Sequence, residues 1–318
     1  MLNRGGFSLK GVTFSGKDPP ECLSEDGVSI SVAGMKWYPK EDLLSIDLSE
    51  LNFAKKSRGR KLVTSSSSSV PLKLTRRHCV SKVSEVFDLT GKLTPIIATM
   101  KLDLHELVHR KLDWDDLIPD NLRPVWESHF EMMKEIKNLR YKRAIVPSDA
   151  VNLNITTIDA GDASQSLACV SIYARFKRQN GQYSCQQVLS RSRLVPDGMS
   201  QPRAELYAAL LNTHTGEVVK RSFYKWHQGS TKLTDSQIVL YWISNDERPL
   251  KQWVRNRVIE IRRFTSPDQW YYVQSKNMIA DIGTRKGTTL EEVNQSSIWI
   301  NGFNWMKNEK SNLLTKFI

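Results

Sequence analysis

Four acidic side chains stand at the ends of expected secondary-structure elements in the second half of the chain: Asp162, Glu205, Asp235 and Asp281. Carboxylate oxygens are the ligands that Mg²⁺ prefers, and two such ions about 3.5–4 Å apart can stabilise the attacking and leaving oxygens of a phosphoryl transfer. If the four carboxylates converge, they are candidates for both catalytic and metal-ligating roles. The plainer interpretation is that two are turn or cap residues and that Glu205 complements a helix dipole from a first turn.

The sequence pattern around these acids predicts a mixed sheet with helices. Apolar alternation predicts strands at 155–162, 168–176 and 186–195, and their short connections predict an antiparallel meander. The pattern continues with a helix from 203 to about 220, a strand at 231–235, helices at 236–244 and 250–264, a strand at 270–274 and a short helix from 279. The first of these helices turns polar at 212–216, which predicts poor packing there.

The first half of the chain has a different pattern. Alternating apolar residues across 28–48 predict a hairpin around the turn at 38–42. A basic, serine-rich stretch at 54–72 cannot bury apolar surface, so we expect a flexible linker. Apolar residues at three- and four-residue spacing then predict helices between 75 and 139. The chain is therefore expected to be an α+β protein.

Composition limits the class of protein. The chain has 318 residues, of which 40% are hydrophobic and 25% charged, which excludes wholesale disorder and a membrane bundle. Its net charge of +12 favours a polyanionic partner, nucleic acid first. The four cysteines show no zinc-ligand spacing, and no apolar stretch is long enough to span a membrane, so we expect an intracellular, cytoplasmic protein.

Several basic residues lie near the acids or on one expected helix. The segment 250–264 carries Lys251, Arg255, Arg257, Arg262 and Arg263 on a face that can follow a phosphate backbone. Arg203 and Arg285 lie close in sequence to Glu205 and Asp281, and Ser164 follows Asp162. Lys251, Arg203, Arg255, Arg257, Arg285 and Ser164 are therefore candidate nucleic-acid contacts. A solvated surface helix is the competing interpretation of the basic segment.

Several motifs in one order resemble the pol polyprotein of Bel/Pao-type LTR retrotransposons, including its Pao retrotransposon peptidase region. RAELYAAL around Glu205, LTDSQIVLYWI around Asp235, NMIADIGTR around Asp281 and GDAS at 161–164 resemble its ribonuclease H segment. GGFSLKG, GMKWYPKEDLLSI, VSEVFDLTGKLTP and LDWDDLIP resemble the stretch after the reverse transcriptase core, and SSIWINGFNWM resembles the approach to integrase. The resemblance covers nearly the whole chain.

The resemblance implies a helical thumb or connection segment followed by a ribonuclease H-like mixed five-stranded sheet with helices. The implied segments are the end of a reverse transcriptase palm with a β-hairpin (1–53), a basic linker (54–72), a helical thumb or connection domain (73–147), a ribonuclease H-like domain (148–290) and a tail toward integrase (291–318). It implies hydrolysis of the RNA strand of RNA–DNA hybrids with two Mg²⁺ ions, or Mn²⁺, beside the remaining palm and integrase segments, in a virus-like particle where the element is active.

Two alternatives remain open at this point. Asp159 lies three residues before Asp162, where the family usually shows a more apolar run, and competes with Asp162 for the first acidic position. The chain is also consistent with an inactive or domesticated pol fragment that binds nucleic acid, or packs against a polymerase, without catalysis. A protease is not favoured, because no Asp-Thr/Ser-Gly loop is present.

Overall fold

The computed structural model describes residues 11–48, 51, 53, 70–245, 249–308 and 314. The described residues fall into two compact units, one within 1–89 and 107–144 and the other within 90–106 and 145–318. They are called unit 1 and unit 2 below. Residues 54–69, which make up most of the expected linker, lie outside the described residues.

Unit 1 contains a small antiparallel sheet in the order β1-β2-β3-β4. Its strands are β1 (Ile30–Val32), β2 (Met35–Tyr38), β3 (Leu43–Ile46) and β4 (Tyr141–Lys142). Met35 pairs with Ile46 and Tyr38 with Leu43, so β2 and β3 form the predicted hairpin around the turn at 38–42. The sheet extends this hairpin on both sides.

Helices α1 (Arg76–Glu85) and α3 (Arg123–Ile136) complete unit 1, and α2 (Thr94–His109) crosses the division between the units. Along α3, the side chains of Trp126, Phe130 and Met133 are buried at helical spacing. The ring of Phe130 also meets that of Phe53 edge-on, with 5.1 Å between the ring centroids. These contacts give unit 1 its apolar core, and they confirm the helices predicted from the periodicity.

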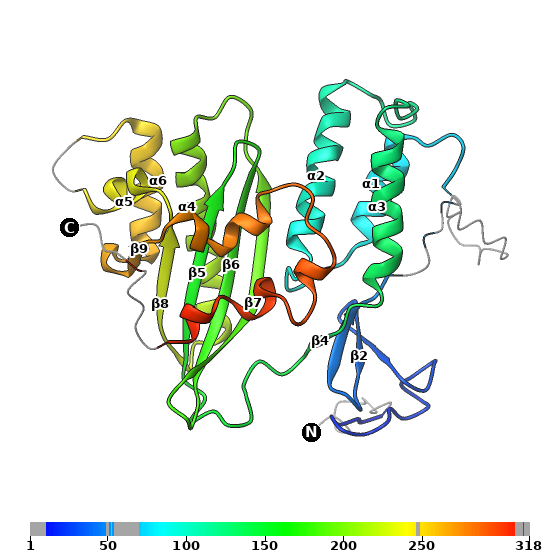
Figure 1. Cartoon of the computed structure of the whole chain (residues 1–318), viewed down its shortest axis with the longest axis horizontal. Coiled ribbons are helices and arrows are strands. Elements are labelled where there is room, and N and C mark those ends of the chain that lie inside the picture. Colours follow the sequence, from blue (N-terminus) through cyan, green and yellow to red (C-terminus); the bar gives the residue numbers. More distant parts are fainter. Residues whose placement is uncertain are drawn as a thin grey trace, which may run out of the picture. The chain divides into compact units, whose positions relative to one another are not determined.

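Unit 2 is built on a five-stranded mixed sheet in the order β7-β6-β5-β8-β9 (Figure 1). The strands are β5 (Ile155–Ala163), β6 (Leu167–Lys177), β7 (Tyr183–Leu194), β8 (His227–Thr234) and β9 (Trp270–Tyr272). The first three are antiparallel, as the predicted meander requires, whereas β8 runs parallel to β5 and β9 parallel to β8. The predicted α+β class with a mixed five-stranded sheet is confirmed.

Helices cover both faces of this sheet. On one face lie α4 (Gln201–Ser222), α5 (Gln237–Ser244) and α6 (Gln252–Phe264), which share apolar clusters with the strands and with one another. The other face is covered by the 3-10 helix η4 (Ile279–Gly283) and by α7 (Ile298–Asn301). The remaining 3-10 helices are η2 (Pro267–Gln269), η3 (Ser275–Asn277), η5 (Glu291–Val293) and η6 (Asn304–Lys307).

Side-chain alternation along β5 sends neighbouring residues to different helices. A Cβ on Gly161 would meet Asn212 of α4, so Gly161 faces α4. The neighbouring Asp162 pairs in register with Cys169, whose Sγ lies against Gly283 of η4. Asp162 therefore lies on the η4 side of the sheet.

Two expectations about α4 are wrong. The helix begins at Gln201 rather than Arg203, so Glu205 lies beyond its first turn and does not act as a first-turn acid. Its polar stretch at 212–216 is not poorly packed, because Asn212, Thr213 and Gly216 are buried. The hydroxyls of this stretch donate to backbone carbonyls of the preceding turn, which satisfies them inside the helix.

Among the described residues, no helix combines the length and the apolar character needed to cross a membrane.

Candidate active site

Asp162 is a half-buried carboxylate near the C-terminal end of β5. Its Oδ2 accepts a hydrogen bond of 2.6 Å from the Thr284 hydroxyl. Burial raises the pKa of Asp162 to about 6; the Thr284 hydrogen bond opposes this rise, and the negative charges of Asp235 and Asp281 add to it. Asp162 therefore lies close enough to Asp235 and Asp281 to sense their charges.

Asp235 follows the last residue of β8, beside the strand that carries Asp162. The alternative role of helix cap belongs to its neighbour, because the Ser236 hydroxyl accepts a hydrogen bond from the Val239 N–H at the start of α5. Asp235 instead accepts a 2.7 Å hydrogen bond from the Ser275 hydroxyl. The Asp235 carboxylate is therefore held by a residue of η3 and does not cap α5.

Asp281 is exposed in η4 and is tied to Asp162 through Thr284. The Thr284 hydroxyl lies 2.6 Å from Asp162 Oδ2 and 3.2 Å from the carbonyl oxygen of Asp281. The Thr284 N–H also donates to that carbonyl, at 3.1 Å. One threonine therefore fixes the end of β5 against the turn that carries Asp281.

Glu205 reaches the same end of β5 from α4. The Gln201 side-chain amide donates to the Ala163 carbonyl at 2.6 Å and to Glu205 Oε1 at 3.3 Å. Ala163 directly follows Asp162, so Gln201 links the fourth acid to the end of the strand. Glu205 is half-buried.

The four carboxylates form an open arrangement. Within the described residues, no three of them bring ligand oxygens within 4.8 Å of one another. In this same part of the chain, no lysine or arginine forms an ion pair with any of the four. Like charges that lie near one another without an opposing cation are the donor set that suits a hard divalent ion, so the residues fit Mg²⁺ or Mn²⁺.

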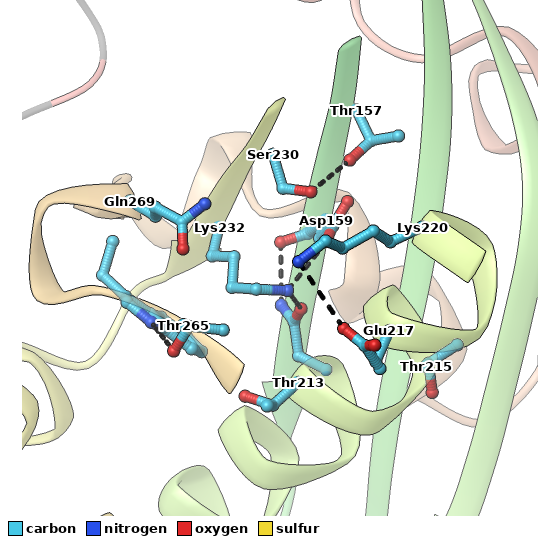
Figure 2. Close-up of polar contacts among 12 residues, drawn as sticks. Thr157, Asp159, Thr213, Thr215, Glu217, Lys220, Ser230, Lys232, Thr265 and Gln269 are labelled. Carbon is cyan, nitrogen blue, oxygen red and sulfur yellow. Dashed lines mark hydrogen bonds and ion pairs between the residues drawn. The ribbon is translucent and has the colours of Figure 1, made fainter. Parts of the chain in front are cut away.

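The competing acid, Asp159, lies elsewhere. Its side chain is fully buried and pairs with Lys232 Nζ at 2.8 Å on the α4 side of β5 (Figure 2). Asp162 lies on the η4 side, next to Thr284. The structure therefore groups Asp162, and not Asp159, with Asp235 and Asp281.

The basic residues of α6 divide into two groups. Lys251 and Arg255 are exposed, whereas Arg257 stacks on the Trp253 ring at 4.0 Å from its centroid. Arg203 of α4 lies 5.3 Å from the same ring, so two guanidiniums flank one indole. Arg262 does not belong to an outer basic face as expected, because it donates to the carbonyls of Ile243 and Asn245 at the end of α5.

The last two predicted contacts also have protein partners. Arg285 forms an exposed ion pair with Glu292. The Ser164 hydroxyl accepts from the Leu167 N–H at 3.1 Å and stabilises the turn between β5 and β6. Neither contact brings these side chains to the carboxylates.

Three residues at the site carry a role that the sequence analysis missed: Thr284, Ser275 and Gln201. Each is a common polar residue that contacts an acid from a different element. Thr284 stands inside the motif NMIADIGTR, but nothing in its residue type marks it as a partner of Asp162. Only the folded chain brings these residues together.

Fold and site together define an α+β domain with acidic side chains gathered around the end of a mixed sheet. The chain belongs to the Pao retrotransposon-like RNaseH-like domain family, whose sequence model matches residues 75–236. The match contains Asp162, Glu205 and Asp235 and ends before Asp281. The family resemblance predicted from the motifs is confirmed. No curated protein matches the chain.

Solved structures of ribonucleases H are similar to part of the chain. The N-terminal RNase H domain from Mycobacterium tuberculosis matches with 8% identity and a TM-score of 0.28, covering 39% of this chain and 86% of that one. RNase H1 from Halobacterium salinarum matches with 11% identity and a TM-score of 0.27, covering 40% and 90%. A foamy viral protease-reverse transcriptase in complex with double-stranded DNA has 11% identity and a TM-score of 0.41, covering 78% of this chain and 38% of that one.

Proposed function

We propose that unit 2 is a ribonuclease H that hydrolyses the RNA strand of RNA–DNA hybrids during reverse transcription of a retrotransposon. The observation that carries this proposal is the grouping of Asp162, Asp235 and Asp281, with which no lysine or arginine of the described residues forms an ion pair. A structural set of acids would be expected to have arginine or lysine partners, as Asp159 does. Family membership supports the same reaction class.

Asp162, Glu205, Asp235 and Asp281 are the residues that would hold two divalent ions, Mg²⁺ or Mn²⁺. Such ions lower the pKa of a water molecule and offset the charge that develops on the leaving 3′-oxygen. In the hydrolysis, the water oxygen bonds to phosphorus as the P–O3′ bond breaks, which leaves a 5′-phosphate and a 3′-hydroxyl. The chain's own task is to keep the four carboxylates charged, oriented and close to the scissile phosphate.

The hydroxyls of Thr284 and Ser275 perform part of that task. Each donates a short hydrogen bond to one carboxylate oxygen, which orients that carboxylate and leaves its other oxygen for a ligand. The Thr284 bond opposes the burial that raises the pKa of Asp162. Thr284 therefore supports the ionised state of Asp162, and both hydroxyls hold their carboxylates in place.

The basic residues would hold the hybrid. Lys251 and Arg255 are exposed on α6, and Arg203 and Arg257 present guanidiniums around Trp253. Contacts of this kind bind phosphates irrespective of sequence and position a duplex on the protein. As part of a pol product, the domain would work beside the remaining palm and the integrase, in the cytoplasm or in a virus-like particle.

One observation favours a second candidate function. Because no three of the four carboxylates approach within 4.8 Å in the described residues, the chain also fits a pol fragment that binds nucleic acid without cleaving it. The two candidates predict the same binding and different chemistry. A single experiment that measures both therefore separates them.

The experiment incubates the purified whole chain with a hybrid labelled on its RNA strand, in Mg²⁺ and in EDTA. We expect cleavage in Mg²⁺ only, and we expect Asp235→Asn to abolish cleavage while hybrid affinity is kept or improved, since a negative charge near a polyanion is removed. Asp268→Asn is the matched control, because Asp268 is an exposed aspartate in η2 outside the site. Wild-type binding without cleavage in Mg²⁺ or Mn²⁺ would favour the binding fragment.

A further inference from the structure

A buried polar network joins three elements of unit 2. Lys232 Nζ of β8 donates to Asp159 Oδ2 of β5 at 2.8 Å and to Asn212 Oδ1 of α4 at 3.2 Å. The Asn212 side-chain amide in turn donates to the backbone carbonyl of Asp159 at 2.8 Å. The side chains of Lys232 and Asp159 are 4% and 0% exposed, so this ion pair lies in the core (Figure 2).

Two glycines allow the helix to approach this closely. A Cβ on Gly216 of α4 would lie 2.6 Å from both Asp159 Oδ2 and Lys232 Nζ. A Cβ on Gly161 of β5 would lie 3.1 Å from the Cβ and Nδ2 of Asn212. A glycine inside a helix is otherwise unfavourable, so Gly216 marks a place where close approach is required.

The network is not arranged for stability alone. Asp159 Oδ1 is buried and finds no hydrogen-bond partner among the described residues, which is costly for a carboxylate. Buried ion pairs are often no more stabilising than apolar residues of similar volume, whereas their directional bonds can select one packing arrangement. This network therefore suits a role in fixing geometry.

Each network residue lies on an element that contains or directly precedes one predicted carboxylate. Along β5, Asp162 follows Asp159 by three residues, and along β8, Asp235 follows Lys232 by three. On α4, Glu205 precedes Asn212 by seven residues, which is about two helical turns and places both on one face of the helix. The three elements that the network joins thus contain Asp162 and Glu205 and lead directly into Asp235.

We propose that Asp159, Asn212 and Lys232 are positioning residues that lock α4 against β5 and β8 and thereby set the spacing of Glu205 to Asp162 and Asp235. The proposal rests on the proposed function, since the spacing matters only for shared cations. The network lies on the α4 side of β5, whereas Asp162 lies on the η4 side with Thr284. Its effect reaches the site through the rigidity of the three elements.

The first test replaces the ion pair with apolar side chains in the double variant Asp159→Leu/Lys232→Met. We expect a folded chain whose thermal midpoint stays close to wild type, with KM for the hybrid unchanged and kcat about 10- to 100-fold lower, as expected for misplaced catalytic groups. The Mg²⁺ concentration needed for half-maximal cleavage should rise. Loss of a merely structural pair would move the thermal midpoint and leave the metal requirement unchanged.

The second test does not require the double variant to fold. Gly216→Ala places a methyl group against both members of the ion pair, whereas the added methyl of the matched control Gly229→Ala on β8 meets no atom of the described residues within 4 Å. Alanine normally favours a helix over glycine, so Gly216→Ala is chosen to move the network without a propensity penalty. We expect Gly216→Ala to reproduce the lower kcat and the raised metal requirement, and Gly229→Ala to behave as wild type.

A metal-binding arm separates this proposal from the proposed function. Mn²⁺ is titrated into wild type, both network variants and Gly229→Ala without nucleic acid. Weaker Mn²⁺ binding in the network variants alone supports positioning, even if the wild type does not cleave hybrid and the proposed function fails. Equal Mn²⁺ affinity and equal kcat in folded network variants would overturn the proposal, and so would a wild type that binds no Mn²⁺.

Discussion

Asp159 and Asp162 are the same residue type three positions apart on one strand, yet the structure treats them in opposite ways. Asp159 is fully buried on the α4 side and faces the ammonium of Lys232 at 2.8 Å. Asp162 is half-buried on the η4 side, where its charged neighbours are the carboxylates of Asp235 and Asp281. The acid on the α4 side therefore faces a cation, whereas the acid on the η4 side faces two further acids.

This difference distinguishes a carboxylate that stabilises the fold from a carboxylate that can bind a metal ion. A buried acid with a protein cation is neutralised inside the fold and has little to offer a ligand. An acid surrounded by like charges has a raised pKa, and an added divalent ion relieves the repulsion. Removing a charge should therefore lower the free energy of unfolding on the α4 side and raise it on the η4 side.

The largest effect is expected on the α4 side. Lys232→Met leaves the Asp159 carboxylate buried without a counter-ion, and removal of one partner of a buried pair costs about 3–5 kcal/mol in free energy of unfolding. Urea denaturation measures the loss. The double variant with Asp159→Leu is the control, because it should recover most of the stability. A single variant as stable as wild type would mean that the pair is not buried in solution.

A smaller effect of opposite sign is expected on the η4 side. Asp162→Asn removes a charge that burial and like-charged neighbours disfavour, so the metal-free chain should gain about 1–3 kcal/mol at neutral pH. The same urea titration measures this gain. Asp268→Asn should leave stability within about 0.5 kcal/mol of wild type, as is usual for a surface position. Destabilisation by Asp162→Asn would contradict the contrast between the two sides.

The pH dependence of stability sharpens the contrast further. The pKa of Asp162 in the folded chain is about 6, above its usual unfolded value of about 3.9. Between these two values the folded state binds a proton that the unfolded state does not, so this residue adds stability as the pH falls through about 6. Added Mg²⁺ competes for the same carboxylate, so its stabilising effect should shrink over the same range.

Thermal unfolding with and without Mg²⁺ across this pH range measures the competition. Asp162→Asn should remove the pH dependence of the Mg²⁺ effect. A Mg²⁺ effect that is constant through pH 6 would show that Asp162 does not bind the ion.

The smallest effect concerns the exposed cations. Arg255→Gln on α6 should weaken hybrid binding modestly and reduce the slope of log affinity against log salt by about 1, since one phosphate contact is lost. Arg193→Gln is the control, because Arg193 is an exposed arginine on β7, at the other edge of the sheet. Equal salt slopes for both variants would mean that α6 does not contact the backbone.

Much of the fold could be predicted from local patterns. Strand alternation and helical periodicity predicted the hairpin of β2 and β3, the meander of β5 to β7 and the order of the later elements. Local patterns fail where a residue's role depends on a distant partner. The polar stretch at 212–216 predicted poor packing because the sequence does not show that Asn212 faces Asp159 and Lys232.

The candidate site could be predicted only in part, because some of its contacts depend on residues that are distant in the sequence. Acidic residues at element ends are visible in the sequence, and the structure places Asp162 near Asp235 and Asp281. The hydroxyls of Thr284 and Ser275 come from separate turns, so no spacing rule connects them to the acids they contact. Arg262 of α6 shows the converse, because its charge predicted a surface role but its guanidinium donates to carbonyls at the end of α5.

Asp162, Asp235 and their neighbours should bind divalent cations, because no lysine or arginine of the described residues pairs with these carboxylates. Calorimetric titration of Mn²⁺ into the wild-type chain at neutral pH and low salt tests it most directly, beside Asp235→Asn and Asp268→Asn. We expect binding by wild type and by Asp268→Asn, and an affinity at least about tenfold weaker for Asp235→Asn. Equal affinity in all three proteins, or no binding by wild type, would contradict it.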